Sequence, residues 1–225
     1  MVDKQLIGDI FGWIGTAITL YFFLSPGIPF FKLIRGQIEV KDAPGLLLIF
    51  SLLNCLLWLN YGLLTNRAQV YSTNGAGSGF TLIFITIFLI YLTKQNFLFT
   101  LLLILALIAV MGAISYLSFF IIYYKYVGIS ANVFNVLMYG ATGEKIYRVF
   151  KTKNYKLMPI FSIIGAFFSA MCWLIYGTFD YDLNVIIPNA LGVMLSFVQL
   201  IVYYYFYYLK RAEEKFVDND DDKLI

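Results

Sequence analysis

The sequence has no histidine, only two cysteines and few charged residues, which make up 13% of its 225 positions. Without histidine, the helix-borne His-Glu-x-x-His zinc motif of metalloproteases cannot form. Cys55 and Cys172 lie far apart and within apolar runs, which is not the spacing of a metal site. A glycine-rich phosphate-binding loop is also missing. We therefore expect neither an enzyme nor a bound metal or cofactor.

Apolar residues are abundant, at 61% of the chain, and aromatic residues reach 19%. A soluble domain of this length has too small a core to bury so many large apolar side chains, whereas a bilayer removes the need to cover them. The formal net charge of +3 does not indicate a nucleic-acid partner, because the basic residues fall in short loops between apolar runs. The expected surroundings are a lipid bilayer.

Seven apolar runs are long enough to span a membrane, which takes about 20 residues for each helix. They lie at about 8–31, 44–64, 71–93, 97–121, 127–150, 159–178 and 184–208. The first run is too long for a signal peptide and lacks a small-residue cleavage site, so we expect it to stay as a helix. The predicted fold class is an all-α integral membrane protein with seven transmembrane helices. The polar, acidic tail from Glu213 onward is predicted to be disordered.

The basic residues gather on one side of the predicted membrane. Of the 16 Lys and Arg residues, only Lys4, Arg67 and Lys125 fall on the side opposite the C-terminus. Cytoplasmic loops collect Lys and Arg, so we expect the N-terminus outside and the C-terminus in the cytosol. We expect the plasma membrane. The segment 220–225 resembles an acidic dileucine sorting signal, which keeps an endosomal or vacuolar membrane as the alternative.

An internal repeat is the most informative feature of the sequence. Identical residues recur at an offset of 115, and the pairs are Pro44 and Pro159, Trp58 and Trp173, Tyr61 and Tyr176, Gly62 and Gly177, Asn74 and Asn189, and Gly77 and Gly192. A unit of three helices ends on the opposite side from its start, so a linker helix is needed to make two copies parallel. We predict a first three-helix repeat at 1–94, a linker helix at 95–126, a second repeat at 127–209 and a cytosolic acidic tail at 210–225.

Two tryptophans and two asparagines are predicted to share one depth near the middle of the membrane. Trp58, Asn74, Trp173 and Asn189 each lie about eight residues inward from an outer turn, or about 12 Å along a helix. An asparagine at that depth must find hydrogen-bond partners or pay a few kcal/mol. Aromatic planes beside amides suit a sugar, because its C–H face stacks on the ring and its hydroxyls pair with the amide. Helix packing is the alternative reading of the tryptophans, but it does not require matched depth in two copies.

Three further residues are predicted to form an outer gate. Tyr61 and Tyr176 lie one turn outside the tryptophans, and each is followed by glycine. Interfacial tyrosines beside loop-entry glycines are the alternative. Asp182, with Asp180, falls at the outer mouth, where we expect a solvated or gating residue and not an ion-coupling group.

Several motifs together resemble those of the SWEET sugar transporter family. They are Phe23-Leu24-Ser25-Pro26, Asn54-Cys55-Leu56-Leu57-Trp58 with Tyr61-Gly62, Ser72-Thr73-Asn74-Gly75, Thr152-Lys153 with Met158-Pro159, and Ile187-Pro188-Asn189. The resemblance covers residues 8–208 and implies two parallel three-helix bundles joined by a linker helix (3+1+3). It also implies that Asn74 and Asn189 bind sugar and that Trp173 lines the pocket. Trp58 occupies a position that varies in the family.

The family resemblance also implies proline hinges near the cytosolic side. Proline lacks the N–H of a helical hydrogen bond and so permits a bend. Pro26, Pro44 and Pro159 match three of the four hinge prolines, whereas Thr142 stands at the fourth position. Symmetric hinging of the second repeat is therefore in question, although Gly140 could supply flexibility. Alternatively, Pro44 and Pro159 simply start helices.

Transport without a coupled ion is the function we expect. Ion-driven carriers place ionisable side chains within the bilayer, and this chain has almost none in its spans. The prediction is facilitative uniport of a sugar, a monosaccharide such as glucose, by alternating access. A related carrier of another small solute and a seven-helix receptor are the alternatives; a charged solute would want a charged pocket residue. A homo-oligomer would only supplement transport, since one chain holds both halves of the pocket.

Overall fold

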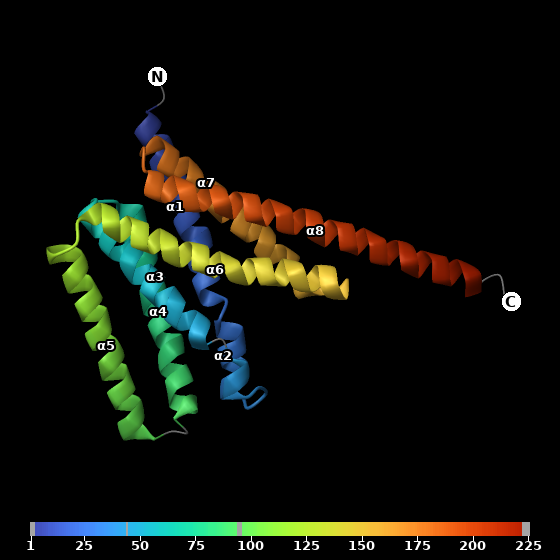
Figure 1. Ribbon diagram of the computed structural model, residues 1–225, viewed down its shortest axis with the longest axis horizontal. Coiled ribbons are helices and arrows are strands. Elements are labelled where there is room, and N and C mark those ends of the chain that lie inside the picture. Colours follow the sequence, from blue (N-terminus) through green and yellow to red (C-terminus); the bar gives the residue numbers. More distant parts are fainter. Residues whose placement is uncertain (1–2, 44, 94–95, 222–225) are drawn as a thin grey trace.

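The computed structural model describes residues 3–43, 45–93 and 96–221. The described residues form eight α-helices and two short 3₁₀ turns, which are drawn in Figure 1. In chain order they are α1 (Lys4–Leu24), α2 (Gly27–Ile34), η1 (Val40–Asp42), α3 (Gly45–Leu64), α4 (Ala68–Leu92), α5 (Phe97–Phe120), α6 (Tyr124–Thr152), η2 (Tyr155–Leu157), α7 (Ile160–Phe179) and α8 (Leu183–Asp221).

The helices agree with the predicted seven-span, all-α fold. Six stretches are long and apolar enough to cross a membrane: α1 with α2, α3, α4, α5, α7 and the first 30 residues of α8. The seventh, α6, has 29 residues. Its lower hydropathy comes from polar residues such as Asn132, Asn135 and Glu144. The side chains of Asn132 and Asn135 form hydrogen bonds with other helices.

The offset of 115 residues is also present in the backbone. Helices α3 and α7 both have 20 residues and start 115 positions apart. The turns η1 and η2 also start 115 positions apart. The turns that follow α3 and α7 each contain a non-glycine residue in the left-handed region, Asn66 with φ 54° and Tyr181 with φ 53°. The two repeats therefore share the length of their second helix and the geometry of their turns.

The first span is broken, unlike its counterpart in the second repeat. Helix α1 ends at Leu24, and α2 begins at Gly27 after Ser25 and Pro26. Proline explains the break, since it removes a backbone donor and clashes with the preceding turn. Helix α6 instead runs without interruption through Thr142.

The predicted disorder of the tail from Glu213 is wrong for the described part. Helix α8 has 39 residues and continues to Asp221. The segment Lys210-Arg211-Ala212-Glu213-Glu214-Lys215 consists of strong helix formers, and it extends a helix that is already nucleated. Polar composition alone therefore gave the wrong expectation.

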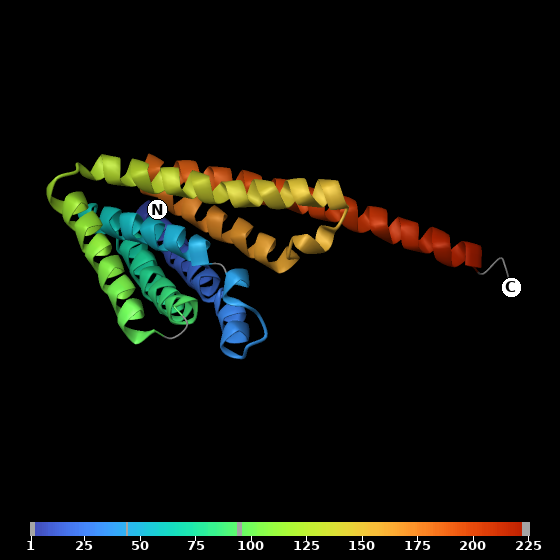
Figure 2. The ribbon, with the colours of Figure 1, turned by 60° about the horizontal axis from the view of Figure 1, so that its bottom comes forward.

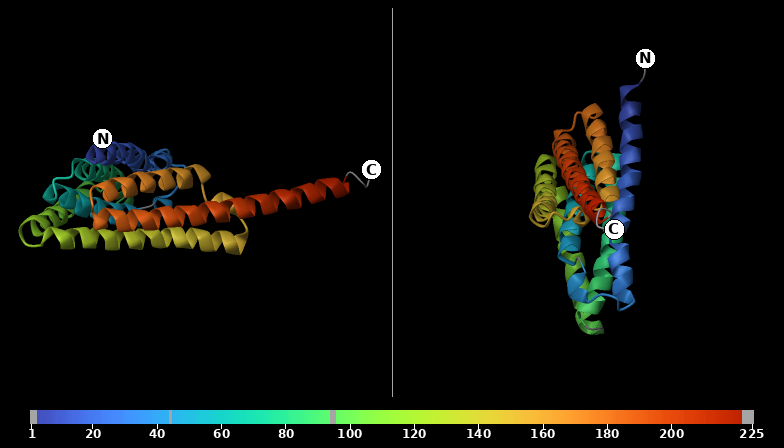
Figure 3. Two further views of the ribbon diagram at one scale, coloured as in Figure 1. Left: turned by 90° about the horizontal axis from the view of Figure 1, so that it is seen from above. Right: turned by 90° about the vertical axis from the view of Figure 1, so that its right-hand side faces the viewer.

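The two repeats meet at one end and diverge toward the other, as Figure 1 shows. Helix α1 packs against α4 and α7, and α3 packs against α4 and α6; Figure 3 shows α1 alongside α7. The linker helix α5 lies against α3 and α4 of the first repeat. We call the end with the 65–67 and 180–182 turns the closed end, and the opposite end, with η1 and η2, the basic end.

Hydrophobic clusters show the same divergence. At the closed end, one cluster joins residues of both repeats, including Tyr61 and Tyr176. Toward the basic end, a second cluster around Phe30 belongs to the first repeat and its linker helix, and a third around Met158 belongs to the second repeat. Among the described residues, the apolar core is thus continuous between repeats only at the closed end.

Candidate binding cavity

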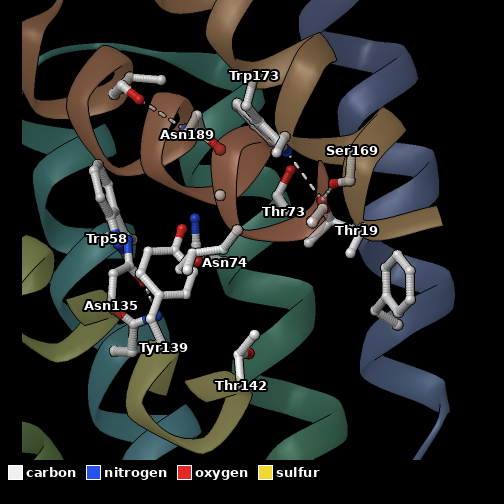
Figure 4. A pocket seen from close by; sticks show the side chains of 18 of the residues that line it. Thr19, Trp58, Thr73, Asn74, Asn135, Tyr139, Thr142, Ser169, Trp173 and Asn189 are labelled. Carbon is white, nitrogen blue, oxygen red and sulfur yellow. Dashed lines mark hydrogen bonds between the residues drawn. The ribbon is translucent and has the colours of Figure 1, made fainter. Parts of the chain in front are cut away.

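A cavity of about 320 Å³ lies between the two repeats. It is lined by Trp58 and Asn74 of the first repeat and by Trp173 and Asn189 of the second, which Figure 4 labels. The structure thus brings together the four residues that the repeat placed at one depth. Each pair comes from helices that the backbone offset relates, α3 with α7 and α4 with α8.

Each tryptophan is held by the tyrosine one turn away on its own helix. The rings of Trp58 and Tyr61 have centroids 5.6 Å apart at 88°, and those of Trp173 and Tyr176 are 5.6 Å apart at 89°. This edge-to-face geometry is favourable for aromatic pairs. Both tryptophans are 8% exposed and both tyrosines 2%. The tyrosines therefore fix the orientation of the indole planes at the cavity wall.

The two asparagines also have matched conformations. The Nδ2 of Asn74 donates to the carbonyl of Val70 over 2.8 Å, and the Nδ2 of Asn189 donates to Val185 over 2.7 Å. An amide has a second N–H and an acceptor oxygen beyond this bond. Neither oxygen accepts a hydrogen bond from the described residues. Each side chain therefore keeps a donor and an acceptor for a polar ligand.

Polar pairs connect the repeats on two sides of the cavity. On one side, the hydroxyls of Thr19 and Ser169 lie 3.0 Å apart, and Trp173 Nε1 donates to Thr19 over 3.0 Å. On the other, Asn54 Nδ2 donates to Asn135 Oδ1 over 2.8 Å. Figure 4 shows Thr19 beside Ser169 and Trp173.

Three residues that line the cavity were not predicted from the sequence: Thr19, Asn135 and Ser169. Ser169 follows Asn54 at the offset of 115, so the repeat carried a signal for that position. Because Asn54 and Ser169 are different residues, a search for identical residues at this offset does not find them. The hydroxyl of Tyr139, another lining residue, donates to the carbonyl of Pro188 over 2.7 Å.

The closed end is held by a charged network between the repeats. Arg67 forms ion pairs with Asp180 and with Asp182, the latter over 2.9 Å. The Tyr61 hydroxyl donates to the Asp182 carboxylate at 2.8–2.9 Å, and Asn184 Nδ2 donates to that hydroxyl over 3.1 Å. Burial works against the charged guanidinium, but the two carboxylates outweigh it and raise the pKa of Arg67 above its usual range. Arg67 therefore remains charged and bridges the two turns.

Two predicted gate residues, Tyr61 and Asp182, thus lie in one network, whereas Tyr176 has different neighbours. Tyr176 packs beside Gly12 and Gln69, so closely that a methyl group on Gly12 would lie 2.8 Å from its ring. Gln69 Nε2 in turn donates to Asp9 Oδ1 over 2.8 Å. The matched tyrosines therefore contact the opposite repeat through different chemistry.

Two of the three prolines of the predicted hinges lie at helix boundaries. Pro26 is the N-cap of α2 and Pro159 the N-cap of α7. Pro44 lies outside the described residues. Thr142, at the position where the resemblance expects a fourth proline, lines the cavity. The hinge function of these residues stays a prediction.

None of the described residues that line the cavity is Asp, Glu, Lys or Arg. The chain contains no His at all. In the described ranges, no group of three His, Cys, Asp or Glu side chains is placed to hold a metal. The described wall of the cavity therefore combines neutral amides, hydroxyls and aromatic rings with aliphatic side chains such as Val70 and Leu195.

A central polar cavity shared by two parallel repeats, closed at one end by contacts between them, defines a membrane carrier. The family described as "Sugar efflux transporter for intercellular exchange" matches this chain twice, at residues 9–96 and 125–211. The chain belongs to this family, the SWEET sugar transporters, and is not an enzyme. The resemblance seen in the sequence motifs is confirmed.

Named relatives and a solved structure agree with this assignment. The bidirectional sugar transporter SWEET7 of Arabidopsis thaliana is 33% identical over 211 residues, which cover 88% of this chain and 80% of that protein. SWEET7b of Oryza sativa subsp. japonica is 32% identical over 215 residues, covering 90% and 79%. The structure of a eukaryotic SWEET transporter superposes with a TM-score of 0.80 at 26% identity, covering 91% of this chain and 98% of that one.

Proposed function

We propose that this chain carries a monosaccharide such as glucose down its concentration gradient, with the cavity between the repeats as the substrate site. The main support is the matched set of Asn74, Asn189, Trp58 and Trp173 around one cavity. The named relatives are bidirectional sugar transporters. A volume of about 320 Å³ is at the small end of ligand pockets, which favours one sugar ring over two.

Uniport is the mechanism that the neutral cavity favours. Proton-driven carriers generally place an ionisable side chain within the bilayer as part of the proton pathway. The lining contains amides, hydroxyls and aromatic rings but no charged side chain among its described residues. Substrate binding would then use hydrogen bonds from the two asparagines and stacking on the two indoles.

Alternating access is supported by the contrast between the two ends. The closed end has the Arg67 network and a shared apolar cluster, whereas the clusters at the basic end are separate. We infer a state that is open at the basic end. Rocking of the repeats (1–94 and 127–209), joined by the linker 95–126, would open the closed end, with Pro26, Pro44 and Pro159 as hinges.

The same proposal includes orientation and location. The excess of Lys and Arg at the basic end favours a cytosolic position for it, with the N-terminus and the closed end outside. The described state would then face the cytosol. We expect the plasma membrane, with endosomal or vacuolar membranes as the alternative. One chain supplies both halves of the cavity, so a homo-oligomer would not be needed to form it.

Uptake of labelled glucose and sucrose in yeast without its own hexose carriers tests the proposal. We expect saturable glucose uptake that stops at equal concentrations and is insensitive to a protonophore. Asn74→Ala and Asn189→Ala should each abolish it. Asn60→Ala is the matched control, because Asn60 is a buried asparagine that bonds to Ser115 and does not line the cavity.

Two results would contradict the proposal. Protonophore-sensitive accumulation above the outside concentration would rule out uniport. Normal glucose uptake by both alanine variants, at the membrane abundance of the parent chain, would exclude the cavity as the substrate site.

A further inference from the structure

A second pocket lies at the basic end, away from the central cavity. Its volume is about 430 Å³, and it shares no lining residue with the cavity between the repeats. The residues that line it are Thr152, Lys153, Asn154, Lys156, Phe206, Leu209 and Lys210. They come from the end of α6, from the connection between α6 and α7, and from α8. Helices α6 and α8 run side by side toward the right of Figure 2.

Three ammonium groups give this pocket a positive charge. Lys153, Lys156 and Lys210 take part in none of the ion pairs formed among the described side chains. Lys153 ends α6 in the left-handed conformation, with φ 53°, which turns the chain toward η2. Within that turn, Asn154 Oδ1 accepts from the backbone N–H of Lys156 over 3.1 Å.

The turn is fixed against α8 by aromatic contacts. The ring of Tyr155 lies edge-on to Tyr203 and Tyr207, with centroids 5.3 Å and 5.5 Å away. These contacts keep Lys153 and Lys156 beside the segment of α8 that carries Lys210. The backbone that carries these lysines is therefore held in place by contacts within the chain.

Neighbouring residues indicate the depth of the pocket in the bilayer. The segment 203–208 of α8 is an unbroken aromatic run of five tyrosines and Phe206. Tyrosine is enriched where the hydrocarbon meets the lipid headgroups. Phe206 is 5% exposed and forms, with Leu209, the apolar side of the pocket. The lysines are thus at headgroup level, above an apolar wall.

The first repeat provides an internal comparison. Its turn η1 matches η2 at the offset of 115, but Glu39 occupies the position of Asn154 and Ile38 that of Lys153. Lys41, the counterpart of Lys156, forms an ion pair with Glu39 over 2.8 Å. The same backbone turn is therefore neutralised in the first repeat and basic in the second.

We propose that this pocket binds the phosphate of an anionic phospholipid in the leaflet at the basic end. Lysine ammonium groups bind phosphate as point charges, and the apolar wall formed by Phe206 and Leu209 would contact the glycerol and upper acyl chain. Lipid, and not soluble phosphate, is favoured because the pocket combines this wall with its place at headgroup level. The site goes beyond the proposed sugar transport and does not depend on it.

Titration of the purified full chain in neutral detergent tests this site. The probe is dioctanoyl phosphatidylinositol phosphate, and binding is read as lipid adducts by native mass spectrometry and as a rise in Tm. The variant K153Q/K156Q/K210Q should weaken binding about 100-fold, since each basic residue near anionic lipid contributes about 1 kcal/mol, or about fivefold. The control K32Q/R35Q/K41Q removes the same charge at the same end of the first repeat and should leave the affinity unchanged.

Four results would overturn the lipid site. They are an absence of adducts with the parent chain, equal binding of dioctanoyl phosphatidylcholine, an equal loss of affinity in both triple variants, and inorganic phosphate that binds as tightly as the lipid. The first two would exclude an anionic lipid ligand, the third would reduce the effect to net charge, and the fourth would identify a soluble anion. The Tm of each variant without lipid shows whether it is folded.

Discussion

Trp58 and Trp173 occupy matched positions in the two repeats, yet their indole groups have different partners. Trp173 donates its N–H to Thr19 of the first repeat, whereas no hydrogen bond from Trp58 Nε1 to the described residues is present. The polar pairs beside them also differ, hydroxyls at Thr19 and Ser169 against amides at Asn54 and Asn135. The repeats thus have the same helix arrangement and the same tryptophan–tyrosine pairs, but each repeat contacts the other through different polar groups.

The strongest test of this difference reverses a charge at the closed end. Arg67 and Asp182 are matched positions with opposite charge, and their side chains are only 19% and 4% exposed. Asp182→Arg puts arginine at both, which leaves two like charges largely buried and unpaired with each other at a cost of about 3–5 kcal/mol, so sugar uptake should fall by about 100-fold or more. The swap R67D/D182R should recover part of it.

The control for this charge reversal is Arg148→Gln. Arg148 pairs with Glu144 within α6, but both side chains are more than half exposed, so uptake should be unchanged. A swap no better than Asp182→Arg would show that the hydrogen bond from Tyr61, and not the pairing of charges, holds the closed end.

Proline substitutions address the break in the first span. Thr142→Pro would interrupt the continuous helix α6 at a cost of about 3 kcal/mol or more, because it removes a helical hydrogen bond and its ring clashes with the preceding turn. Pro26→Ala should have a smaller effect, since α1 already ends before this residue. The Tm of each variant in detergent measures the difference. A larger loss for Pro26→Ala would mean that the break itself stabilises the fold.

Glycine substitutions compare the tight approach of helices in the two repeats. A methyl group on Gly62 would lie 2.7 Å from the backbone nitrogen of Tyr71, whereas one on Gly177 would lie 3.0 Å from the side chain of Val185. Gly62→Ala should cost about 1–3 kcal/mol, and Gly177→Ala less, because its nearest contact is longer, at 3.0 Å against 2.7 Å. Gly140→Ala, with nothing within 4 Å, should raise the Tm slightly. Equal Tm losses at Gly62 and Gly177 would contradict this ranking.

The smallest expected difference separates the two tryptophans. Trp173→Phe keeps an aromatic ring but removes the donor to Thr19, which should cost about 1 kcal/mol more than Trp58→Phe. Thermal unfolding in detergent gives the comparison. In a Thr19→Val background the gap should close, since the acceptor is gone. A gap that persists there would assign it to ring packing.

Most of the fold could be predicted from apolar runs, but two features could not. The first run continues through Ser25 and Pro26 with no charged residue, so its composition does not show whether proline bends the helix or ends it. The segment after Leu209 has the composition of a disordered tail, yet it extends α8 to Asp221. The break after α1 and the extension of α8 both depend on whether the preceding helical turn continues. The composition of a segment does not show this.

The candidate site was predictable where the repeats kept the same residue. Trp58, Asn74 and their counterparts were found by identity at the offset of 115, and all four line one cavity. Thr19 and Asn135 were missed because they differ in type and are 116 positions apart, one more than the main offset. Cross-repeat contacts depend on how the two bundles face each other, and a comparison of one repeat with the other contains no such information.

The ion pair between Arg67 and Asp182 also bears on the ancestry of the chain. The two residues hold equivalent places in their repeats and meet each other across the axis between them. In a symmetric pair of identical single-repeat chains, such a position would face its own copy, and like charges would meet. An opposite-charge contact there requires two copies that can mutate independently. This lock is therefore younger than the duplication, and two unfused, identical halves could place charge pairs at their closed end only between different positions of the repeat, each pair then occurring twice.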